Sequence, residues 1–173
     1  MASYYYLISS LPLLKTQGEP PLDYAAFLSM CRSAVSGSVY KTLEELTVNS
    51  GKGSLLSEWS AFYQRLSSEL AYQRNIKLGR PCAVPYERDA NIVQTVTAAV
   101  NAENPLEGEQ LLLDLEFRRL DDMIGLHIFD EHALYGYAMK LRLLERQRSF
   151  SHDRGKQAFD SLMDGIRQQI SSL

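Results

Sequence analysis

The amino-acid sequence predicts a mostly α-helical protein, built as a bundle of antiparallel helices. Three observations favour this class. In most long segments, apolar residues recur every three or four positions, which is the spacing of one helix face. Capping residues stand before these segments and glycines stand after several of them. Strand signals are scarce, because no Asn-Gly turn separates alternating runs and no strand–helix alternation is present. Helices with one apolar face bury that face by packing against each other.

The length and composition fit a soluble globular protein. A chain of 173 residues has room for a single helical domain, or for two small helical lobes. Pro81 and Pro85 make residues 79–88 the candidate lobe boundary. The apolar fraction of 45% and the charged fraction of 23% are ordinary for a soluble protein. A net charge of −3 offers no overall electrostatic reason to bind nucleic acid.

The sequence predicts a cytoplasmic location. No apolar run reaches the length of a transmembrane helix. The apolar N-terminus lacks the basic residues that begin a secretory signal. Cys31 and Cys82 lack the spacing of a zinc knuckle or a disulfide framework, so we expect two reduced thiols.

The first elements are short. Residues 4–14 are apolar and aromatic and fit either a strand or a helix, which Pro12 would end. Asp23 is the expected N-cap of a helix that Gly37 ends. A short helix is expected to follow at residues 39–46.

Two central segments differ in how clearly they predict a helix. A long helix begins at Ser54 or Ser57 and ends near residue 78, where Gly79 stops it. Its apolar face consists of Leu55, Trp59, Phe62, Leu66 and Leu70. The segment from Asp89 to Asn101 is rich in Val and Thr, which are weak helix formers, so it fits a helix or a strand.

The C-terminal half predicts three helices. The first spans residues 106–124, between the Asn104-Pro105 pair and Gly125. The second spans residues 130–148. The last begins at Ser151 or Asp153 and runs to about residue 170, and its inward positions are Phe159, Leu162, Met163, Ile166 and Ile170.

The helix at 130–148 carries the candidate binding residues. Asp130 is its N-cap, and its apolar face is formed by Leu134, Tyr137, Leu141 and Leu144. The basic residues gather towards its C-terminal end, so we expect a helix that buries one face and offers charge to a partner. The candidate partner-binding residues are Lys140, Arg142, Arg146 and Arg148. An alternative is that they only stabilise the helix, with Arg142 pairing with Glu145.

One cluster could hold a metal. His127 and Glu131 are four residues apart and His132 is adjacent, so a continuous helix would align the first two. The N-cap at Asp130 instead places a helix start between them, which favours a helix-start acid beside two surface histidines. We therefore expect no metal and no cofactor. A metal protein or enzyme using His127, Glu131 and His132 is the alternative.

The other polar clusters do not indicate an enzyme. Asp121 and Asp122 adjoin Arg118 and Arg119, which fits a solvated helix face with local ion pairs. No nucleophile elbow is present, and no arrangement of Ser, His and Asp marks a triad. We expect a protein that is not an enzyme.

Two blocks of sequence resemble one family. The first block, from residue 4, is YYYLISSLPLL, followed by a Pro-Pro pair and DYAAFLSMC. The second block is ALYGYAMKLRLLERQRSF, followed by DRGKQAFDSLM. Both blocks resemble the DUF2764 family of bacterial proteins encoded with V-type ATPase subunits. Between them, the stretch LAYQRNIKLGRP and the helical texture are also similar.

The resemblance implies a non-catalytic part of a rotary V/A-type ATPase. Residues 137–146 are distantly similar to helix ends in the all-helical C/d-type socket of these ATPases. That socket links the central stalk to the membrane rotor ring and has no catalytic site. This chain is shorter than the C/d-type socket and lacks its threefold repeat. The resemblance therefore implies either a reduced socket or an accessory, assembly or adaptor factor.

The same resemblance implies partners and a location. The partners would be central-stalk and membrane-ring subunits, and the chain would reach the cytoplasmic face of the membrane only through them. Lys140, Arg142 and Arg146 would then dock on an acidic face of a stalk or ring subunit.

Overall fold

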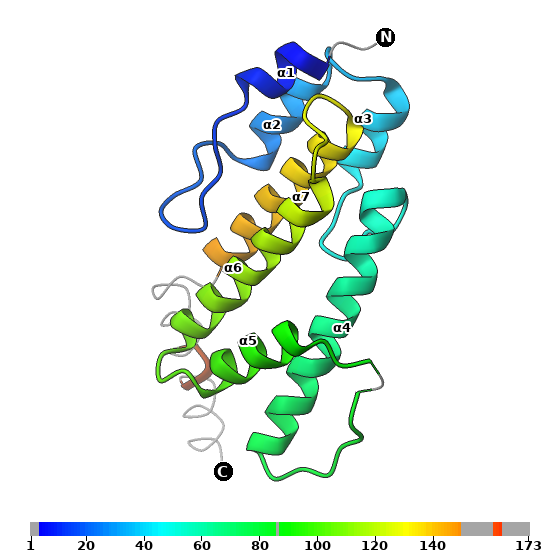
Figure 1. The fold of residues 1–173 in the computed structure, drawn as a ribbon. Coiled ribbons are helices and arrows are strands. Elements are labelled where there is room, and N and C mark those ends of the chain that lie inside the picture. The colour runs from blue at the N-terminus through cyan, green and yellow to red at the C-terminus, as the bar shows by residue number, and fades with distance from the viewer. Residues whose placement is uncertain (1–3, 86, 150–160, 164–173) are drawn as a thin grey trace, which may run out of the picture.

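The computed structural model describes residues 4–85, 87–149 and 161–163. These residues form seven complete helices and no strand, which confirms the mostly α-helical class. Figure 1 shows an elongated arrangement, with α1, α2 and α3 at one end and α5 at the other. Helices α4, α6 and α7 run between these ends, and α6 and α7 lie side by side.

The first two helices are shorter than expected. Helix α1 spans Tyr4–Ser10, so the first apolar segment is a helix and not a strand. Helix α2 spans Tyr24–Cys31, and the Asp23 side chain accepts a hydrogen bond from the Ala26 N–H at 2.7 Å. The prediction that Gly37 ends this helix is wrong. Ser36 has an extended backbone and is the N-cap of a new helix, α3, which spans Gly37–Glu44. Serine favours this position because its side-chain oxygen accepts a hydrogen bond from a free N–H group in the first turn.

Helix α4 spans Ser54–Lys77, as the periodicity predicts. The Trp59 side chain is completely buried, and its indole N–H donates to the Val48 carbonyl at 2.8 Å. Gly79 follows the helix with φ 65°, a left-handed conformation that only glycine adopts at little cost. The N–H of Arg80 donates to the Asn75 carbonyl at 2.9 Å, which closes the helix end.

The loop at 79–88, the candidate lobe boundary, leads into helix α5, Ala90–Asn101. This segment is a helix despite its Val and Thr content. Asp89 caps it by accepting from the Asn91 N–H at 2.8 Å, and Ile92 and Val96 are buried. Helices α4 and α5 pack directly against each other across this loop. Tertiary burial therefore outweighs the weak helix propensity of the segment.

Helix α6 spans Pro105–Ile124 and begins with Asn104 as N-cap and proline in the first turn. It crosses α5 closely, because a Cβ atom at Gly108 would lie 2.6 Å from the carbonyl oxygen of Ala99. Gly125, with φ 54°, ends the helix where the sequence predicts.

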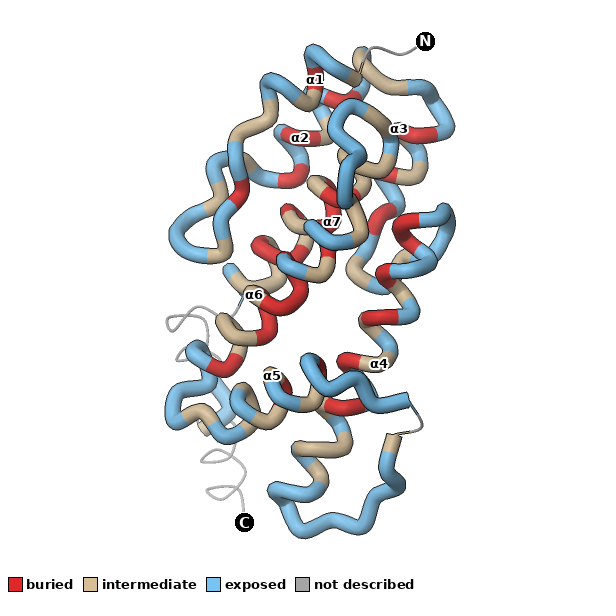
Figure 2. Tube along the Cα trace, viewed as in Figure 1, coloured by how far each residue is buried: buried red, intermediate tan, exposed pale blue. Residues whose placement is uncertain are grey.

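Helix α7 spans Glu131–Arg148 and is the centre of the fold. It contacts α1, α2, α3, α4 and α6. Figure 2 shows its buried residues along the faces that meet these neighbours. One hydrophobic cluster joins side chains from all seven helices. The last predicted helix falls mostly outside the described residues, and within the helical residues 161–163 Leu162 is exposed instead of inward.

Candidate functional site

The Lys140 side chain does not point into solvent from α7. Its ammonium group forms an ion pair with Asp121 of α6. The same group lies 5.4 Å from the centre of the Phe117 ring, within the range of a cation–π contact. Its side chain is only 14% exposed. Lys140 therefore joins α7 to α6.

Arg142 joins α7 to the N-terminal helices. Its guanidinium carbon lies 3.4 Å from the centre of the Tyr24 ring, and its Nε donates to the Leu46 carbonyl at 3.0 Å. The predicted pair with Glu145 is confirmed, at 3.2 Å. Glu145 also accepts from the Tyr24 N–H at 3.0 Å, in the first turn of α2. Burial raises the pKa of the Tyr24 hydroxyl, while Arg142 opposes the rise.

Arg146 pairs with a carboxylate in the core. Its two terminal nitrogens donate to the two oxygens of Glu116 at 3.0 and 2.6 Å. The Tyr63 hydroxyl accepts a longer hydrogen bond from Arg146 at 3.4 Å. Glu116 is 1% exposed. Burial raises the pKa of Glu116, and the hydrogen bonds from Arg146 oppose that rise. Paired and doubly hydrogen-bonded, the carboxylate is satisfied inside the bundle.

The predicted outward basic face is therefore wrong for Lys140, Arg142 and Arg146. These residues are drawn inward because α7 is surrounded by five other helices, which supply acidic and aromatic partners on its polar flank. Arg148, in the last turn, is exposed as expected. A partner-binding role for the four residues stays a prediction.

A second internal ion pair was not predicted from the sequence. Glu69 of α4 accepts from Arg88 at 3.0 and 2.6 Å and from Gln73 at 2.8 Å. Gln73 lies one helical turn from Glu69, as residues four positions apart do, whereas the sequence carries no signal for a residue 19 positions away across a loop. The hydrogen bonds from Arg88 lower the pKa of Glu69, although burial opposes them. The Glu69–Arg88 ion pair holds the C-terminal end of the 79–88 loop against α4.

Three possible metal ligands meet at the start of α7. The structure brings together His127, Asp130 and His132, whose ligand atoms all lie within 4.8 Å of one another. The predicted trio was wrong in one member, because Glu131 instead accepts from the Tyr4 hydroxyl at 3.2 Å. Asp130 takes its place because the N-cap side chain turns back over the helix start, towards the loop that holds His127.

The cluster is fixed by several contacts. One Asp130 oxygen accepts from the Ala133 N–H at 3.1 Å and the other contacts Nδ1 of His127. The two imidazole rings are stacked, with their centres 4.3 Å apart. Nε2 of His132 lies 2.6 Å from the Ser54 hydroxyl, at the start of α4. Burial acts to raise the pKa of Asp130, but hydrogen bonds from Ala133 and His127 outweigh it and lower the pKa.

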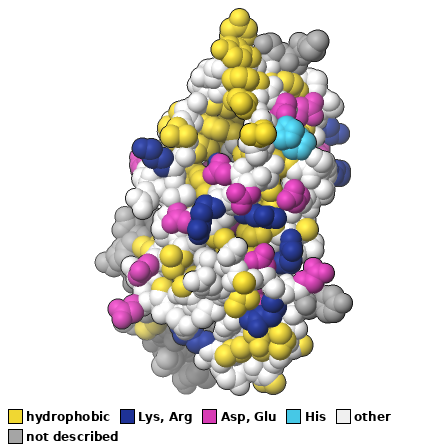
Figure 3. Space-filling view, in the orientation of Figure 1, with side chains coloured by type: hydrophobic (Ala, Val, Ile, Leu, Met, Phe, Trp, Pro, Cys, Tyr) yellow, Lys and Arg dark blue, Asp and Glu magenta, His cyan; other side chains and the backbone are white. Residues whose placement is uncertain are grey.

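Exposed hydrophobic side chains gather beside this cluster. They come from α1 and from the loop between α6 and α7, and we call them the apolar end: Tyr5, Tyr6, Leu126, Ile128 and Phe129. Leu126 is 96% exposed and Tyr6 76% exposed, while the rings of Tyr5 and Phe129 lie 4.6 Å apart. Figure 3 shows hydrophobic atoms at the upper end of the molecule, with histidine close by. A group of large exposed apolar side chains of this kind is typical of an interaction site.

The blocks that carry the family resemblance meet behind the apolar end. The Tyr137 hydroxyl of α7 donates to the Pro12 carbonyl at 2.9 Å. The Tyr137 ring lies 5.5 Å from that of Phe27 in α2. Segments far apart in the sequence therefore form one packed unit, and α1 from the first block contributes Tyr5 and Tyr6 to the exposed surface.

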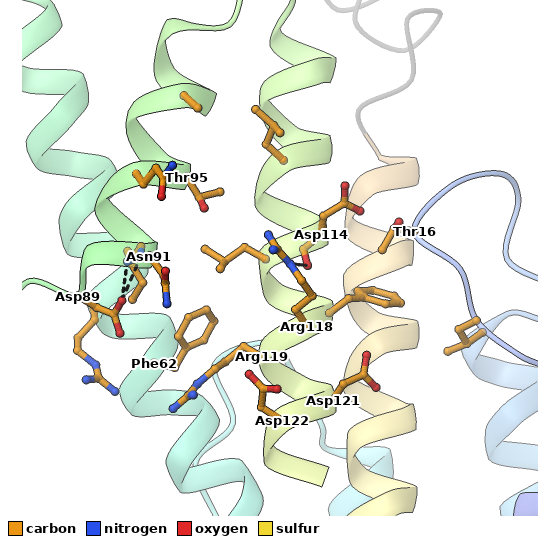
Figure 4. A pocket seen from close by; sticks show the side chains of 18 of the residues that line it. Thr16, Phe62, Asp89, Asn91, Thr95, Asp114, Arg118, Arg119, Asp121 and Asp122 are labelled. Carbon is orange, nitrogen blue, oxygen red and sulfur yellow. Dashed lines mark hydrogen bonds between the residues drawn. The ribbon is translucent and has the colours of Figure 1, made fainter. Parts of the chain in front are cut away.

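A cleft of about 1030 Å³ lies between α4, α5 and α6. Figure 4 shows acidic and basic side chains along it. Asp89 caps α5, Asp114 accepts from Gln110 at 3.0 Å, and Asp121 pairs with Lys140. These carboxylates are held by structural partners. The local ion pairs predicted between Asp121 or Asp122 and the adjacent arginines are not found among the described residues. Asp121 pairs with Lys140 of α7, and Arg119 pairs with Glu58 of α4 at 3.4 Å.

No family model, curated protein or solved structure matches this chain. Within the described ranges, no helix combines the length and the apolar character that crossing a membrane requires.

Proposed function

We propose that this chain is a non-catalytic component of a rotary V/A-type ATPase, a socket that links the central stalk to the membrane rotor ring. It would act on the cytoplasmic face of the membrane, held there by protein partners only. The family resemblance of the two sequence blocks supports the assignment to this complex. The observation that carries an interaction role is the apolar end, which leaves five large hydrophobic side chains in solvent.

The composition of the apolar end fits a protein partner. Tyr and Phe are enriched at protein interfaces because they bring a large contact area with few rotatable bonds. Tyr5 and Phe129 already contact each other, so part of this surface is ordered before binding. A partner would gain affinity from such a prearranged aromatic patch.

The internal ion pairs support a load-bearing role. Lys140, Arg142 and Arg146 connect α7 to α6, α2 and the loop before α4. Among the described residues, every buried side-chain nitrogen or oxygen has a hydrogen-bond partner. A satisfied polar network favours one arrangement of the helices, which is what a part that transmits force requires.

The test is co-purification of the tagged chain from its native cell at moderate salt. We expect V/A-type ATPase stalk or ring subunits to be recovered in fixed ratio. The variant Tyr6→Ser/Ile128→Ser should lose them, because it removes two exposed anchors of the apolar end. Val84→Ser, which changes an exposed apolar residue in the 79–88 loop, is the matched control and should retain them.

Two outcomes would change the proposal. If the parent chain recovers no ATPase subunit while the complex is intact in the same lysate, the assignment is wrong. If it recovers only incompletely assembled subcomplexes, an assembly or adaptor factor replaces the socket.

A further inference from the structure

We infer that His127, Asp130 and His132 form a binding site for a divalent transition-metal ion of the zinc type. The site lies at the junction of the α6–α7 loop, the first turn of α7 and the start of α4. This inference stands on the cluster alone and does not depend on the proposed function.

The ligand set fits the chemistry of zinc. Imidazole nitrogen and carboxylate oxygen bind Zn²⁺ at about 2.0–2.2 Å, which places the ligand atoms of a tetrahedral site about 3.4 Å apart. The three side chains already hold their ligand atoms within 4.8 Å of one another. Binding of an ion therefore requires the ligand atoms to approach one another by roughly a further ångström. Three protein ligands leave a fourth position for water or for a group of a partner.

Two of the ligands are oriented by neighbours that are not themselves part of the trio. The cap hydrogen bond with Ala133 uses one oxygen of Asp130 and leaves the other facing His127. Ser54 holds one ring nitrogen of His132 at 2.6 Å. Outer partners of this kind fix the ring orientation and tautomer of metal-ligating histidines, and their loss weakens metal sites.

Helix capping explains only part of this arrangement. An N-cap aspartate needs its contact with Ala133 and nothing more. It does not require a second imidazole stacked at 4.3 Å on the first, nor a serine from α4 bonded to that second ring. A metal ion bound to His127, Asp130 and His132 would account for the three sets of ligand atoms lying within 4.8 Å of one another.

The test is titration of the full-length, chelator-stripped protein with Zn²⁺, followed by calorimetry. Co²⁺ binding, followed by visible absorption, reports whether the site has a tetrahedral nitrogen–oxygen ligand field. We expect saturable binding of one ion per chain. His127→Ala and His132→Ala should each weaken it by at least about tenfold. Asp130→Asn should weaken it as well, and because asparagine is also a good N-cap, the helix start is preserved.

Two matched controls distinguish this site from general surface binding. Glu131→Gln removes the adjacent carboxylate, which the structure places on Tyr4, and should leave zinc affinity unchanged. His152→Ala removes the third histidine of the chain, outside the described residues, and should also leave it unchanged. Far-UV circular dichroism of each variant confirms that it is folded.

The inference is overturned if the parent protein shows no saturable zinc binding. It is also overturned if His127→Ala and His132→Ala bind as tightly as the parent, or if Glu131→Gln weakens binding as much as Asp130→Asn. Because the apolar-end variants leave these ligands in place, failure of the metal site and failure of the ATPase assignment are separate results.

Discussion

Arg146 is the residue on which the buried carboxylate of Glu116 depends. Both oxygens of Glu116 accept from this one guanidinium, and the carboxylate has almost no contact with water. Removing one partner of such a pair leaves an uncompensated charge, whereas replacing both with apolar groups can be nearly neutral. We therefore expect replacement of one partner alone to cost far more stability than replacement of both partners together.

We predict that Arg146→Met lowers the free energy of unfolding by about 3–5 kcal/mol. The double variant Arg146→Met/Glu116→Leu should recover most of that loss, because no charge is then left buried. Urea denaturation of the three proteins measures the difference. A single variant as stable as the parent would show that Glu116 is satisfied without Arg146.

Glu69 predicts a pH dependence of stability. Its pKa is lowered from the ordinary value of 4.5 by hydrogen bonds from Arg88. A lowered pKa in the folded state means that the ionised form stabilises the fold. This contribution is fully present above pH 4.5 and is lost as the pH falls through the lower, folded-state pKa.

We therefore expect Glu69→Gln to lose less stability than the parent when the pH falls from neutral to about pH 3. Glu116, whose pKa is raised, contributes in the opposite direction, but it does so equally in both proteins. Urea denaturation across this pH range measures the effect. Glu19→Gln, which removes an exposed carboxylate, is the control. Parallel pH curves for the parent and Glu69→Gln would contradict the prediction.

The starts of the helices could be predicted from the local sequence more often than their ends. Asp23 and Asp130 were expected as N-caps, and both accept hydrogen bonds from the following turn, as Asp89 also does. The boundary between α2 and α3 was missed, because Gly37 fits a helix end as well as a helix start. Ser36, whose side chain accepts from the Val39 N–H, decided it.

The crossing of α5 and α6 gives a prediction about how two helices pack. Gly108→Ala places a Cβ atom 2.6 Å from the backbone oxygen of Ala99, which cannot rotate away. Alanine is the better helix former by about 1 kcal/mol, so propensity alone predicts stabilisation. We expect the opposite, because forcing the two helices apart costs about 1–3 kcal/mol.

Thermal and urea unfolding of Gly108→Ala measure whether the gain in helix propensity or the cost of separating α5 and α6 is larger. Gly37→Ala is the matched control, since a Cβ atom there meets nothing within 4 Å. It should be as stable as the parent or slightly more stable. If Gly108→Ala also gains stability, the helices of this crossing shift apart at little cost.

Across the whole molecule, two unlike ends are joined by α6 and α7. One end carries the exposed hydrophobic side chains and the histidine–aspartate cluster, and the other carries α5 packed on the C-terminal part of α4 (Figure 1). A single hydrophobic cluster reaches both, so a force applied at one end meets a continuous core. This is the geometry that the proposed socket would use.

The helical class, most helix positions and the main N-caps could be predicted from the chain alone. These features depend on residues three or four positions apart, and that spacing can be read along the chain. The apolar faces of α4 and α7 were correct for the same reason: Trp59 and Leu141 are completely buried where the periodicity placed them inward.

The pairing of charges and the exposure of individual side chains depend instead on how the helices pack. Arg146 meets Glu116 and Arg88 meets Glu69 across 30 and 19 positions of sequence, and no local rule links them. The same limit explains why the outward basic face was wrong and why Asp130 replaced Glu131 in the cluster. Whether a side chain faces solvent depends on how many helices surround its own, and α7 is surrounded by five.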